Sequence, residues 1–319
     1  MPHKLQNITV LIPLFNEENL LDELFGRLLR LPSEALPKLH FLLVDDGSTD
    51  RTPMLISRFV EGREDFSAVF LSRNFGHSRA ITAGLMHVGD EADAVFLLDG
   101  DLQDPPELLS GFVEKMDEGY DVVYGIRNKR KEGPVKRFCY HAYYRLLRRS
   151  ANISMPLDAG DFSLISRKVV RQLQSMPEES RYIRGMRSWV GFPQTGIPYE
   201  RASRHSGDSK YSLSGLLKLA GNGLFNFSEL PVRFIGIMGM LAVFPSLIYL
   251  LVTLAKKLLY GSVPEGFTAL IFAIVLFSGV QLLSLAIIGE YVLRIFFQVK
   301  QRPLFLVKSK IIKGKVVHE

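Results

Sequence analysis

Two long stretches without a charged residue constrain this chain more than any other feature. Residues 234–255 and 267–289 contain no Asp, Glu, Lys or Arg. A helix needs about 20 apolar residues to cross the roughly 30 Å of a bilayer's hydrocarbon core, so each stretch is long enough to span a membrane. The alternative is a pair of helices buried in a protein core. The connection at 256–266 is too short for another domain, so the two stretches predict a transmembrane hairpin.

Basic residues gather around these stretches. Residues 201–319 hold 14 Lys and Arg against 5 Asp and Glu, whereas residues 1–200 hold 25 against 28. A basic excess beside apolar spans favours contact of the chain with anionic lipid headgroups in the membrane. No aromatic-basic motif of a nucleic-acid-binding module accompanies it, so we expect no nucleic-acid partner.

The same charges predict the topology. Seven Lys and Arg follow the second stretch, and the positive-inside rule places that end of the chain in the cytoplasm. Two spans return the chain to one side, so we expect a multi-pass protein of the inner (plasma) membrane with its N-terminal domain and both termini cytoplasmic. The first residues do not resemble a signal peptide. The single cysteine, Cys139, fits a reducing compartment.

The N-terminal part of the chain alternates short apolar runs with helical patterns. The runs are residues 8–15, 40–45, 67–74, 94–98 and 120–127. This alternation indicates an α/β fold, with a Rossmann-like, mostly parallel sheet and right-handed crossovers. No G-x-G-x-x-G follows the first run and no P-loop motif occurs, which argues against a dinucleotide oxidoreductase and a P-loop NTPase.

The fourth run ends in two carboxylates, Asp99 and Asp101, on either side of Gly100. Two carboxylates at the end of one strand can turn toward a single hard cation, and Gln103 adds a carbonyl oxygen. Oxygen ligands suit Mg²⁺ or Mn²⁺, which normally bridge protein carboxylates to substrate phosphates. Gly100 leaves room for the close approach of a ligand. The alternative is a charged turn without a metal.

Further polar residues follow the other runs. They are Asn16, Glu17, Asp45, Asp46 and Arg127. Ligands of open α/β sheets bind beyond the carboxyl ends of the strands, so these side chains are expected to share one site with the acidic pair.

Three segments connect this half of the chain to the spans. Residues 127–137 form a basic loop, either a phosphate clamp or a solvated loop. Residues 135–152 have the pattern of an amphipathic helix that lies on a membrane or packs as an ordinary helix. Residues 211–227 are a candidate interfacial helix leading into the first span.

Several motifs occur together. They are Pro13-x-x-Asn16-Glu17-Glu18, residues 44–50, Ser72 to His77, residues 99–107, Gly160-Asp161-Phe162, Arg204 to Tyr211, Gly289-Glu290-Tyr291 and Arg302-Pro303. In this combination the chain resembles the family-2 inverting glycosyltransferases of GT-A fold. Within them it is similar to the polyisoprenyl-phosphate hexosyltransferases, such as dolichol-phosphate mannose synthases and bactoprenol-phosphate glucosyltransferases. The resemblance extends over nearly the whole chain, including the two terminal spans.

The resemblance implies a nucleotide-sugar donor, a divalent metal and a polyprenyl-phosphate acceptor. The donor-binding residues that it implies are Pro13, Phe15, Glu17, Asp45, Asp46, Asp99 and Gly100. The metal ligands would be Asp99, Asp101 and Gln103, and the cations for donor or acceptor phosphates would be Arg127, Arg137, Arg204 and Lys210. Asp161 and Asp158 are the catalytic candidates. Asp161 would accept a residual proton, orient the acceptor, or only brace its loop.

These expectations define an organisation and a function. We expect a GT-A catalytic domain at 1–210, an interfacial segment at 211–232, two transmembrane helices within 233–293 and a basic tail at 294–319. The enzyme would move a hexose, from UDP-glucose first, to a polyprenyl phosphate. The alternatives are a GDP-mannose-dependent enzyme like dolichol-phosphate mannose synthase, a processive polysaccharide synthase and a non-catalytic membrane scaffold. The oligomeric state stays open, a homo-oligomer included.

Overall fold

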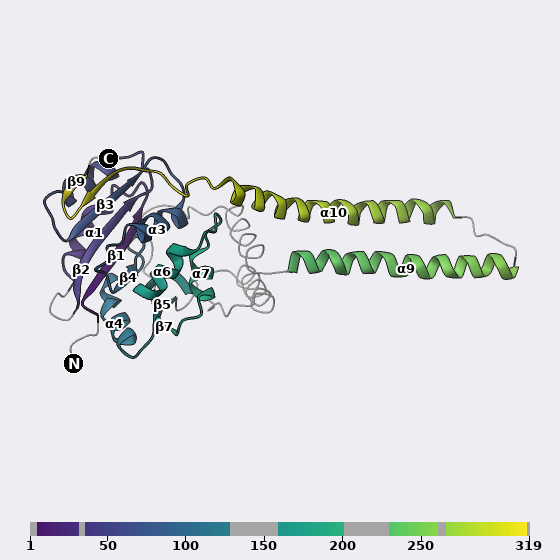
Figure 1. Cartoon of the computed structure of the whole chain (residues 1–319), viewed down its shortest axis with the longest axis horizontal. Coiled ribbons are helices and arrows are strands. Elements are labelled where there is room, and N and C mark those ends of the chain that lie inside the picture. Colours follow the sequence, from purple (N-terminus) through teal and green to yellow (C-terminus); the bar gives the residue numbers. More distant parts are fainter. Residues whose placement is uncertain (1–4, 32–35, 128–158, 201–229, 261–265, 318–319) are drawn as a thin grey trace. The chain divides into compact units, whose positions relative to one another are not determined.

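The computed structural model describes residues 5–31, 36–127, 159–200, 230–260 and 266–317 (Figure 1). The chain divides into a sheet unit and a helical unit, and the helical unit contains α9 and α10. The elements are β1 (Asn7–Leu14), α1 (Leu21–Leu28), β2 (Lys38–Asp45), α2 (Thr52–Val60), β3 (Phe66–Leu71), α3 (His77–Met86), β4 (Ala94–Leu97), η1 (Pro106–Leu108), α4 (Leu109–Asp117), β5 (Val122–Arg127), β6 (Ala159–Ser166), α6 (Arg167–Ser175), α7 (Ile183–Trp189), β7 (Gln194–Tyr199), α9 (Leu230–Tyr260), α10 (Phe267–Lys300), β8 (Val307–Ile312) and β9 (Lys315–Val317).

The described strands form one mixed sheet in the order β7-β5-β6-β4-β1-β2-β3-β8-β9. β1 pairs in parallel with β2 and β4, β2 with β3, and β5 with β7. β6 and β8 run antiparallel to their neighbours. All five strands expected from the apolar runs are present, so the mostly parallel α/β sheet is confirmed.

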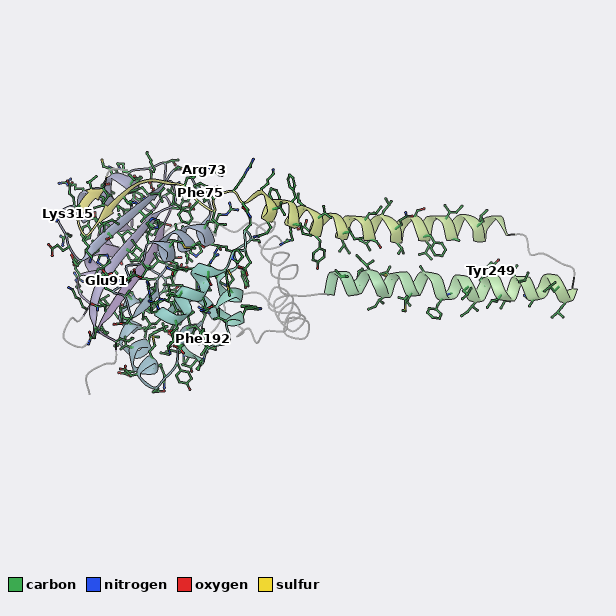
Figure 2. The ribbon with its side chains drawn as sticks, viewed as in Figure 1. Arg73, Phe75, Glu91, Phe192, Tyr249 and Lys315 are labelled. Carbon is green, nitrogen blue, oxygen red and sulfur yellow. The ribbon has the colours of Figure 1, made fainter. Side chains whose placement is uncertain are left out.

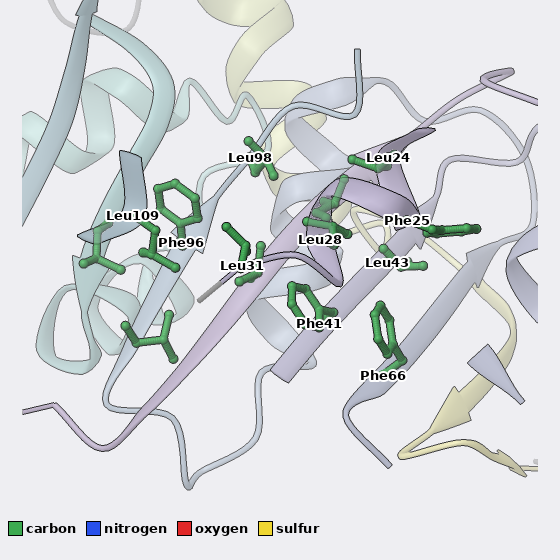
Figure 3. Packing of buried hydrophobic residues seen from close by; sticks show 14 of the residues in the cluster. Leu24, Phe25, Leu28, Leu31, Phe41, Leu43, Phe66, Phe96, Leu98 and Leu109 are labelled. Atoms are coloured by element: carbon green, nitrogen blue, oxygen red, sulfur yellow. The ribbon is translucent and has the colours of Figure 1, made fainter. Parts of the chain in front are cut away.

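Helices cover both faces of this sheet because its central strands are apolar on both sides. Alternate residues of β1, Ile8, Val10 and Ile12, belong to the same buried cluster as apolar residues of α1, α2 and α4. Figure 3 shows this cluster, with Leu24 and Phe25 of α1 lying over the sheet. On the opposite face, Gly84 of α3 packs so closely on Leu11 that an added Cβ would overlap the leucine side chain. Such two-sided burial is typical of parallel strands.

The residues after the second span differ from the expected basic tail. α10 continues to Lys300, and residues 307–317 form β8 and β9. β8 pairs antiparallel with β3, and Ile311 is buried. The pairing occupies the N–H and C=O groups that the edge of β3 would otherwise expose. The alternation of Lys308 and Lys310 with less polar residues is the strand signal that the overall basic charge of this segment conceals.

The helical unit consists of α9 and α10, which contact each other. The helices contain segments long and apolar enough to cross a membrane, Phe234–Lys256 and Leu276–Lys300. Their apolar side chains, with Tyr249 among them, project outward from the helices and are largely exposed (Figure 2). The second segment lies further along the chain than the expected span of 267–289 and includes a Glu290–Arg294 ion pair of 2.9 Å.

Candidate active site

A cavity of about 340 Å³ lies at the carboxyl ends of the parallel strands. Among the residues that line it are these predicted site residues: Pro13, Phe15, Glu17, Asp46, Asp99, Gly100, Asp101, Gln103, Arg127 and Asp161. Asp45 lines a neighbouring cavity of about 520 Å³, which shares Phe15 and Asn74 with the first. The other predicted site residues lie outside the described residues: Arg137, Asp158, Arg204 and Lys210. The sheet therefore gathers the described candidates at one edge.

The acidic loop after β4 is held in a strained conformation. Leu102 follows Asp101 with a φ of 59° and is buried. A bulky residue seldom adopts this left-handed conformation, and it persists when the surroundings fix it, often at functional sites. A Cβ on Gly100 would overlap Leu14 and lie 3.2 Å from the carbonyl oxygen of Pro13. The space at Gly100 thus serves packing against β1, whereas the sequence suggested room for a ligand.

Negative charge accumulates around Asp99. Burial is the main cause that raises the pKa of this carboxyl; His77 opposes the rise, and the carboxylates of Asp104, Asp161 and Asp101 add to it. A cation bound between neighbouring carboxylates favours their ionised forms. Asp101 also shapes the loop, because its Oδ1 accepts the N–H of Gln103 at 3.2 Å.

The donor set fits a hard divalent cation. Asp99, Asp101 and Gln103 offer oxygen atoms to the same cavity. Within the described residues, no three His, Cys, Asp or Glu side chains form a metal cage by themselves. Mg²⁺ and Mn²⁺ are usually held by one or two carboxylates together with substrate phosphates, so an all-protein cage is not required at this kind of site.

Asp161 is clamped by two cations at the start of β6. Arg184 of α7 donates from Nε and Nη2 to its two oxygens, each at 3.1 Å. His77 Nε2 lies 3.5 Å from Asp161 Oδ2 and 3.6 Å from Asp99 Oδ1. Burial would raise the pKa of Asp161, but Arg184 and His77 outweigh it and hold that pKa far below its usual range. Burial likewise opposes the charge of His77, yet the two carboxylates raise its pKa to about 9.

The turn after β2 is fastened to the loop that precedes α3. Asp46 accepts the N–H groups of Phe75 and Gly76, both at 2.8 Å, so it shapes this loop as well as lining the cavity. Gly47 has a φ of 65°, and an added Cβ would overlap the main chain of Arg73. The Arg73 guanidinium lies 4.3 Å from the centre of the Phe75 ring (Figure 2). Asp45 turns away from the cavity and accepts the N–H of Ser48 at 3.2 Å.

Three polar or charged residues of this site were not predicted from the sequence. They are Asn74, His77 and Arg184, all of which line the cavity. Asn74 and His77 stood in the Ser72 to His77 motif without an assigned role, and Arg184 stood in a basic, aromatic segment. Only the packing of α7 and α3 against the strand ends places them beside the acidic residues.

A buried cation lies behind the site. Arg187 of α7 is 1% exposed and donates from Nη2 to the carbonyl oxygen of Gly160 at 3.3 Å. Its Nε and Nη1 have no hydrogen-bond partner in the described structure. Burial lowers the pKa of this guanidinium to about 10, with Asp161 as the main opposing influence. The start of β6, which carries Asp161, is therefore contacted by two guanidinium groups of α7, Arg184 at the carboxylate and Arg187 at the carbonyl of Gly160.

Known proteins are similar to this chain over most of its length. The model of Glycosyl transferase family 2 matches residues 9–174. The glycosyltransferase YkcC of Bacillus subtilis is 38% identical over 302 residues, which cover 94% of this chain and 93% of the relative. The SfII prophage-derived bactoprenol glucosyl transferase of Shigella flexneri is 33% identical over 304 residues, covering 95% of this chain and 97% of the relative.

A solved structure of low sequence identity is also similar. The mannosyltransferase PcManGT from Pyrobaculum calidifontis, in complex with GDP-Man and Mn²⁺, aligns with a TM-score of 0.43 at 15% identity, over 89% of this chain and 90% of that chain. The family model and the near full-length relatives identify the chain. It belongs to glycosyl transferase family 2, the glycosyltransferases of GT-A fold that its motifs predicted.

Proposed function

We propose that this protein transfers a hexose from a nucleotide sugar, UDP-glucose in the first instance, to a polyprenyl phosphate. The observation that carries the proposal is the cavity in which Asp99 and Asp101 face Arg127 and Arg184. It combines ligands for a cation–diphosphate complex with cations for further phosphate oxygens. The near full-length similarity to bactoprenol glucosyl transferases supports the choice of a lipid phosphate and of glucose.

The donor occupies the cavity across the strand ends. Pro13, Phe15 and Glu17 border its nucleotide part together with Asp46, and Asp45 lies behind them. Asp99, Asp101 and Gln103 would hold Mg²⁺ or Mn²⁺ beside the donor's diphosphate. When bound, the cation stabilises the negative charge that develops on the departing nucleoside diphosphate. Arg127 contributes a fixed positive charge to the same leaving group.

The acceptor brings its own nucleophile. A phosphate monoester is close to a dianion at neutral pH, so one of its oxygens attacks the anomeric carbon without a strong base. The bond from that carbon to the diphosphate breaks, and attack from the opposite side inverts the configuration. The roles of Arg204 and Lys210 in binding the acceptor phosphate rest on the motifs, and that of Arg137 rests on the basic loop at 127–137.

Asp161 orients groups in this reaction rather than removing a proton. Both of its oxygens are engaged by Arg184, and His77 lies against one of them. A carboxylate that is paired with two cations is a weak base. Its role is then to hold these two cationic side chains beside the acceptor. Asp158, in the same segment, stays a candidate for the same task.

The membrane supplies the acceptor. α9 and α10 hold the chain in the inner membrane, with the catalytic domain and both termini in the cytoplasm, where nucleotide sugars are soluble. The boundaries proposed for the catalytic domain and the interfacial segment are those given by the sequence, with β8 and β9 added to the catalytic sheet. Protease added outside intact cells should cut only near residues 256–266, and cleavage of the N-terminal domain from outside would contradict this topology.

The decisive experiment is a transfer assay with the full chain in lipid nanodiscs. Nanodiscs containing a polyprenyl phosphate are incubated with Mn²⁺ and, in separate samples, with labelled UDP-glucose, GDP-mannose and a UDP-linked amino sugar. We expect label from UDP-glucose in a lipid-soluble, mild-acid-labile monophosphate product of inverted anomeric configuration.

Three outcomes would contradict parts of this proposal. Label in a polymer would indicate a processive synthase, and label from GDP-mannose alone would replace the donor. No lipid-linked label from any donor, in a preparation that melts as a folded protein, would overturn the proposed transfer. The matched control is Asp101→Asn, which should fold and form product about 10³-fold more slowly.

A further inference from the structure

The third carboxylate of the acidic run turns away from the cavity. Asp104 follows Asp101 by three residues, and its side chain is 0% exposed. It does not line the cavity that Asp99 and Asp101 share. The Tyr199 hydroxyl, at the end of β7, donates to Asp104 Oδ1 at 2.5 Å. The carboxyl group is thus engaged inside the protein, by a partner 95 residues away in the sequence.

Tyr199 connects this buried carboxylate to Arg127. Arg127 Nε donates to the Tyr199 oxygen at 3.3 Å, and Arg127 Nη2 lies 3.8 Å from Asp104 Oδ2. The parallel register of β5 and β7 places Arg127 directly opposite Tyr199. Three groups from three separate elements therefore form one chain, carboxylate to phenol to guanidinium, whose last member lines the cavity.

Two glycines make room for this chain. A Cβ on Gly125 would lie 2.6 Å from Tyr199 Cε1 and 2.7 Å from Phe162 Cδ1, closer than side-chain carbons approach. A Cβ on Gly160 would lie 3.1 Å from Arg127 Nη2. Gly125 thus admits the phenol ring, and Gly160 admits the guanidinium against β6. The backbone on both sides is shaped around Tyr199 and Arg127.

The charges of the chain agree with its geometry. Burial opposes the charge of Arg127, but Asp104 and Tyr199 together outweigh it and raise the pKa of the guanidinium. Burial raises the pKa of Tyr199, and Asp104 adds to the rise, so the phenol keeps its proton and remains a donor. Tyr199 can then donate to Asp104 and accept from Arg127 at the same time.

We infer that Tyr199 and Asp104 are positioning residues that hold the Arg127 guanidinium in place for a phosphate of the substrate. The inference rests on the proposed function for the identity of that phosphate. An arginine at a strand end loses rotamer freedom when a ligand fixes it. The contacts with Tyr199 and Asp104, here called the anchor, already restrict the Arg127 side chain in the free protein. Most of the entropy loss therefore does not occur on ligand binding, which is the usual benefit of preorganisation.

The test is a double-mutant cycle in the full chain, made of Arg127→Ala, Tyr199→Phe and their combination. Tyr199→Phe keeps the ring in its pocket and removes only the hydroxyl. We expect it to lower kcat/KM for transfer about tenfold, the effect of one hydrogen bond to a charged group. The melting temperature should also fall, because the buried Asp104 carboxylate loses its donor, so kcat/KM is compared at a temperature at which every variant is folded. In the Arg127→Ala background the same substitution should leave kcat/KM unchanged, because its effect on transfer passes through Arg127. Additive losses would overturn the inference.

A second readout does not depend on the reaction. Phenylglyoxal modifies accessible guanidinium groups, and peptide mass spectrometry gives the rate at Arg127 itself. We expect roughly tenfold faster modification of Arg127 in Tyr199→Phe, because the anchor that half-buries it is gone. The matched control is Tyr120→Phe. Tyr120 precedes the first residue of β5 and packs against the core, so its substitution should leave the modification rate of Arg127 unchanged.

The outcomes separate the two proposals. An equal rate at Arg127 in the wild-type protein and in Tyr199→Phe would overturn the positioning role, whatever the transfer assay gives. Absence of lipid-linked hexose from the wild-type protein would overturn the proposed function and leave the reagent experiment valid. If Tyr199→Phe does not fold, Gly160→Ala serves instead, because it keeps Tyr199 and its methyl group would lie only 3.1 Å from Arg127 Nη2. It should raise the modification rate and lower transfer, and wild-type values of both would contradict the inference.

Discussion

The two ends of the central strands carry similar side chains in opposite electrostatic arrangements. At the carboxyl ends, Asp99 lies among other carboxylates, which help to raise its pKa, and the neighbouring turn holds the strained Leu102. At the amino ends, a cavity of about 450 Å³ is lined by paired groups. There Lys313 Nζ lies 2.8 Å from Glu91 Oε1. At the carboxyl edge several carboxylates surround Asp99, although Arg184 and His77 pair with Asp161, whereas Lys313 and Glu91 form an ion pair at the amino edge.

The amino-terminal edge uses its polar groups to fasten the chain. Ser67 Oγ accepts the N–H of Lys313 at 2.9 Å and lies 3.0 Å from His40 Nε2. These contacts hold the turn between β8 and β9 against β3. The carboxyl edge instead gathers carboxylates of like charge, which costs stability and prepares a site for a charged ligand. Substitutions should therefore affect transfer at one edge and stability at the other.

The largest expected effect is that of Asp101→Asn. Loss of one carboxylate ligand should lower kcat about 10³-fold, since a catalytic cation contributes several kcal/mol. Because the change also removes one of several like charges, the melting temperature should stay constant or rise. Transfer assays and thermal melting of the full chain in nanodiscs measure both, and chelation of divalent metals should match the loss. Full activity in chelator would contradict the metal assignment.

Arg184→Ala should have the next largest effect. It removes two charge-assisted hydrogen bonds from Asp161 and one cation from the cavity. Because hydrogen bonds to charged groups contribute about 1.5–3 kcal/mol, we expect transfer to fall roughly 10- to 100-fold. Arg171→Ala, on the exposed side of α6, is the control and should retain wild-type kinetics. Equal transfer rates in the Arg184→Ala and Arg171→Ala variants would contradict a role of the Arg184–Asp161 pair in the reaction.

Ser67→Ala tests the amino-terminal edge. The buried hydroxyl holds both His40 and the main chain of Lys313, so its loss should lower the free energy of unfolding by about 1–2 kcal/mol. Transfer by the folded protein should not change. Denaturant unfolding together with the transfer assay separates the two effects, with Ser309→Ala on the exposed face of β8 as the control. A loss of transfer without a loss of stability would contradict the division between the edges.

The smallest expected effect is a pH dependence of the free energy of unfolding, caused by His40 at the amino-terminal edge. Burial, followed by the Lys313 ammonium, lowers the pKa of His40 below its ordinary 6.5, although Glu91 and Asp65 oppose the shift and Lys38 adds to it. The unfolded chain binds the proton more readily, so this contribution to stability is complete above pH 6.5 and is lost as the pH falls through the lowered pKa.

We expect the loss to be less than about 1 kcal/mol between pH 7.5 and pH 5.5. His40→Gln should remove this part of the pH dependence while keeping a polar partner for Ser67. Parallel denaturant titrations of both proteins at the two pH values measure the difference. Identical pH dependences in the two proteins would show that another group is responsible.

The sequence by itself predicted the first five strands, the two long apolar helices and one edge of the site. Apolar runs ending in polar residues are local signals, and parallel strands align their carboxyl ends, so these signals alone predict that Glu17, Asp46 and Asp99 lie together. The two uncharged stretches similarly predicted α9 and α10, because a helix long and apolar enough to span a membrane is recognisable from composition alone.

Only the tertiary structure decided which charges meet. Asp101 and Asp104 belong to one acidic run, yet the first faces the cavity and the other is buried against Tyr199. Arg184 reaches Asp161 because β6 inserts antiparallel between β4 and β5, and β8 joins β3 from the far end of the chain, with Val307 opposite Leu71. Strand order and long-range pairing depend on packing between distant segments, and no local pattern of residues encodes them.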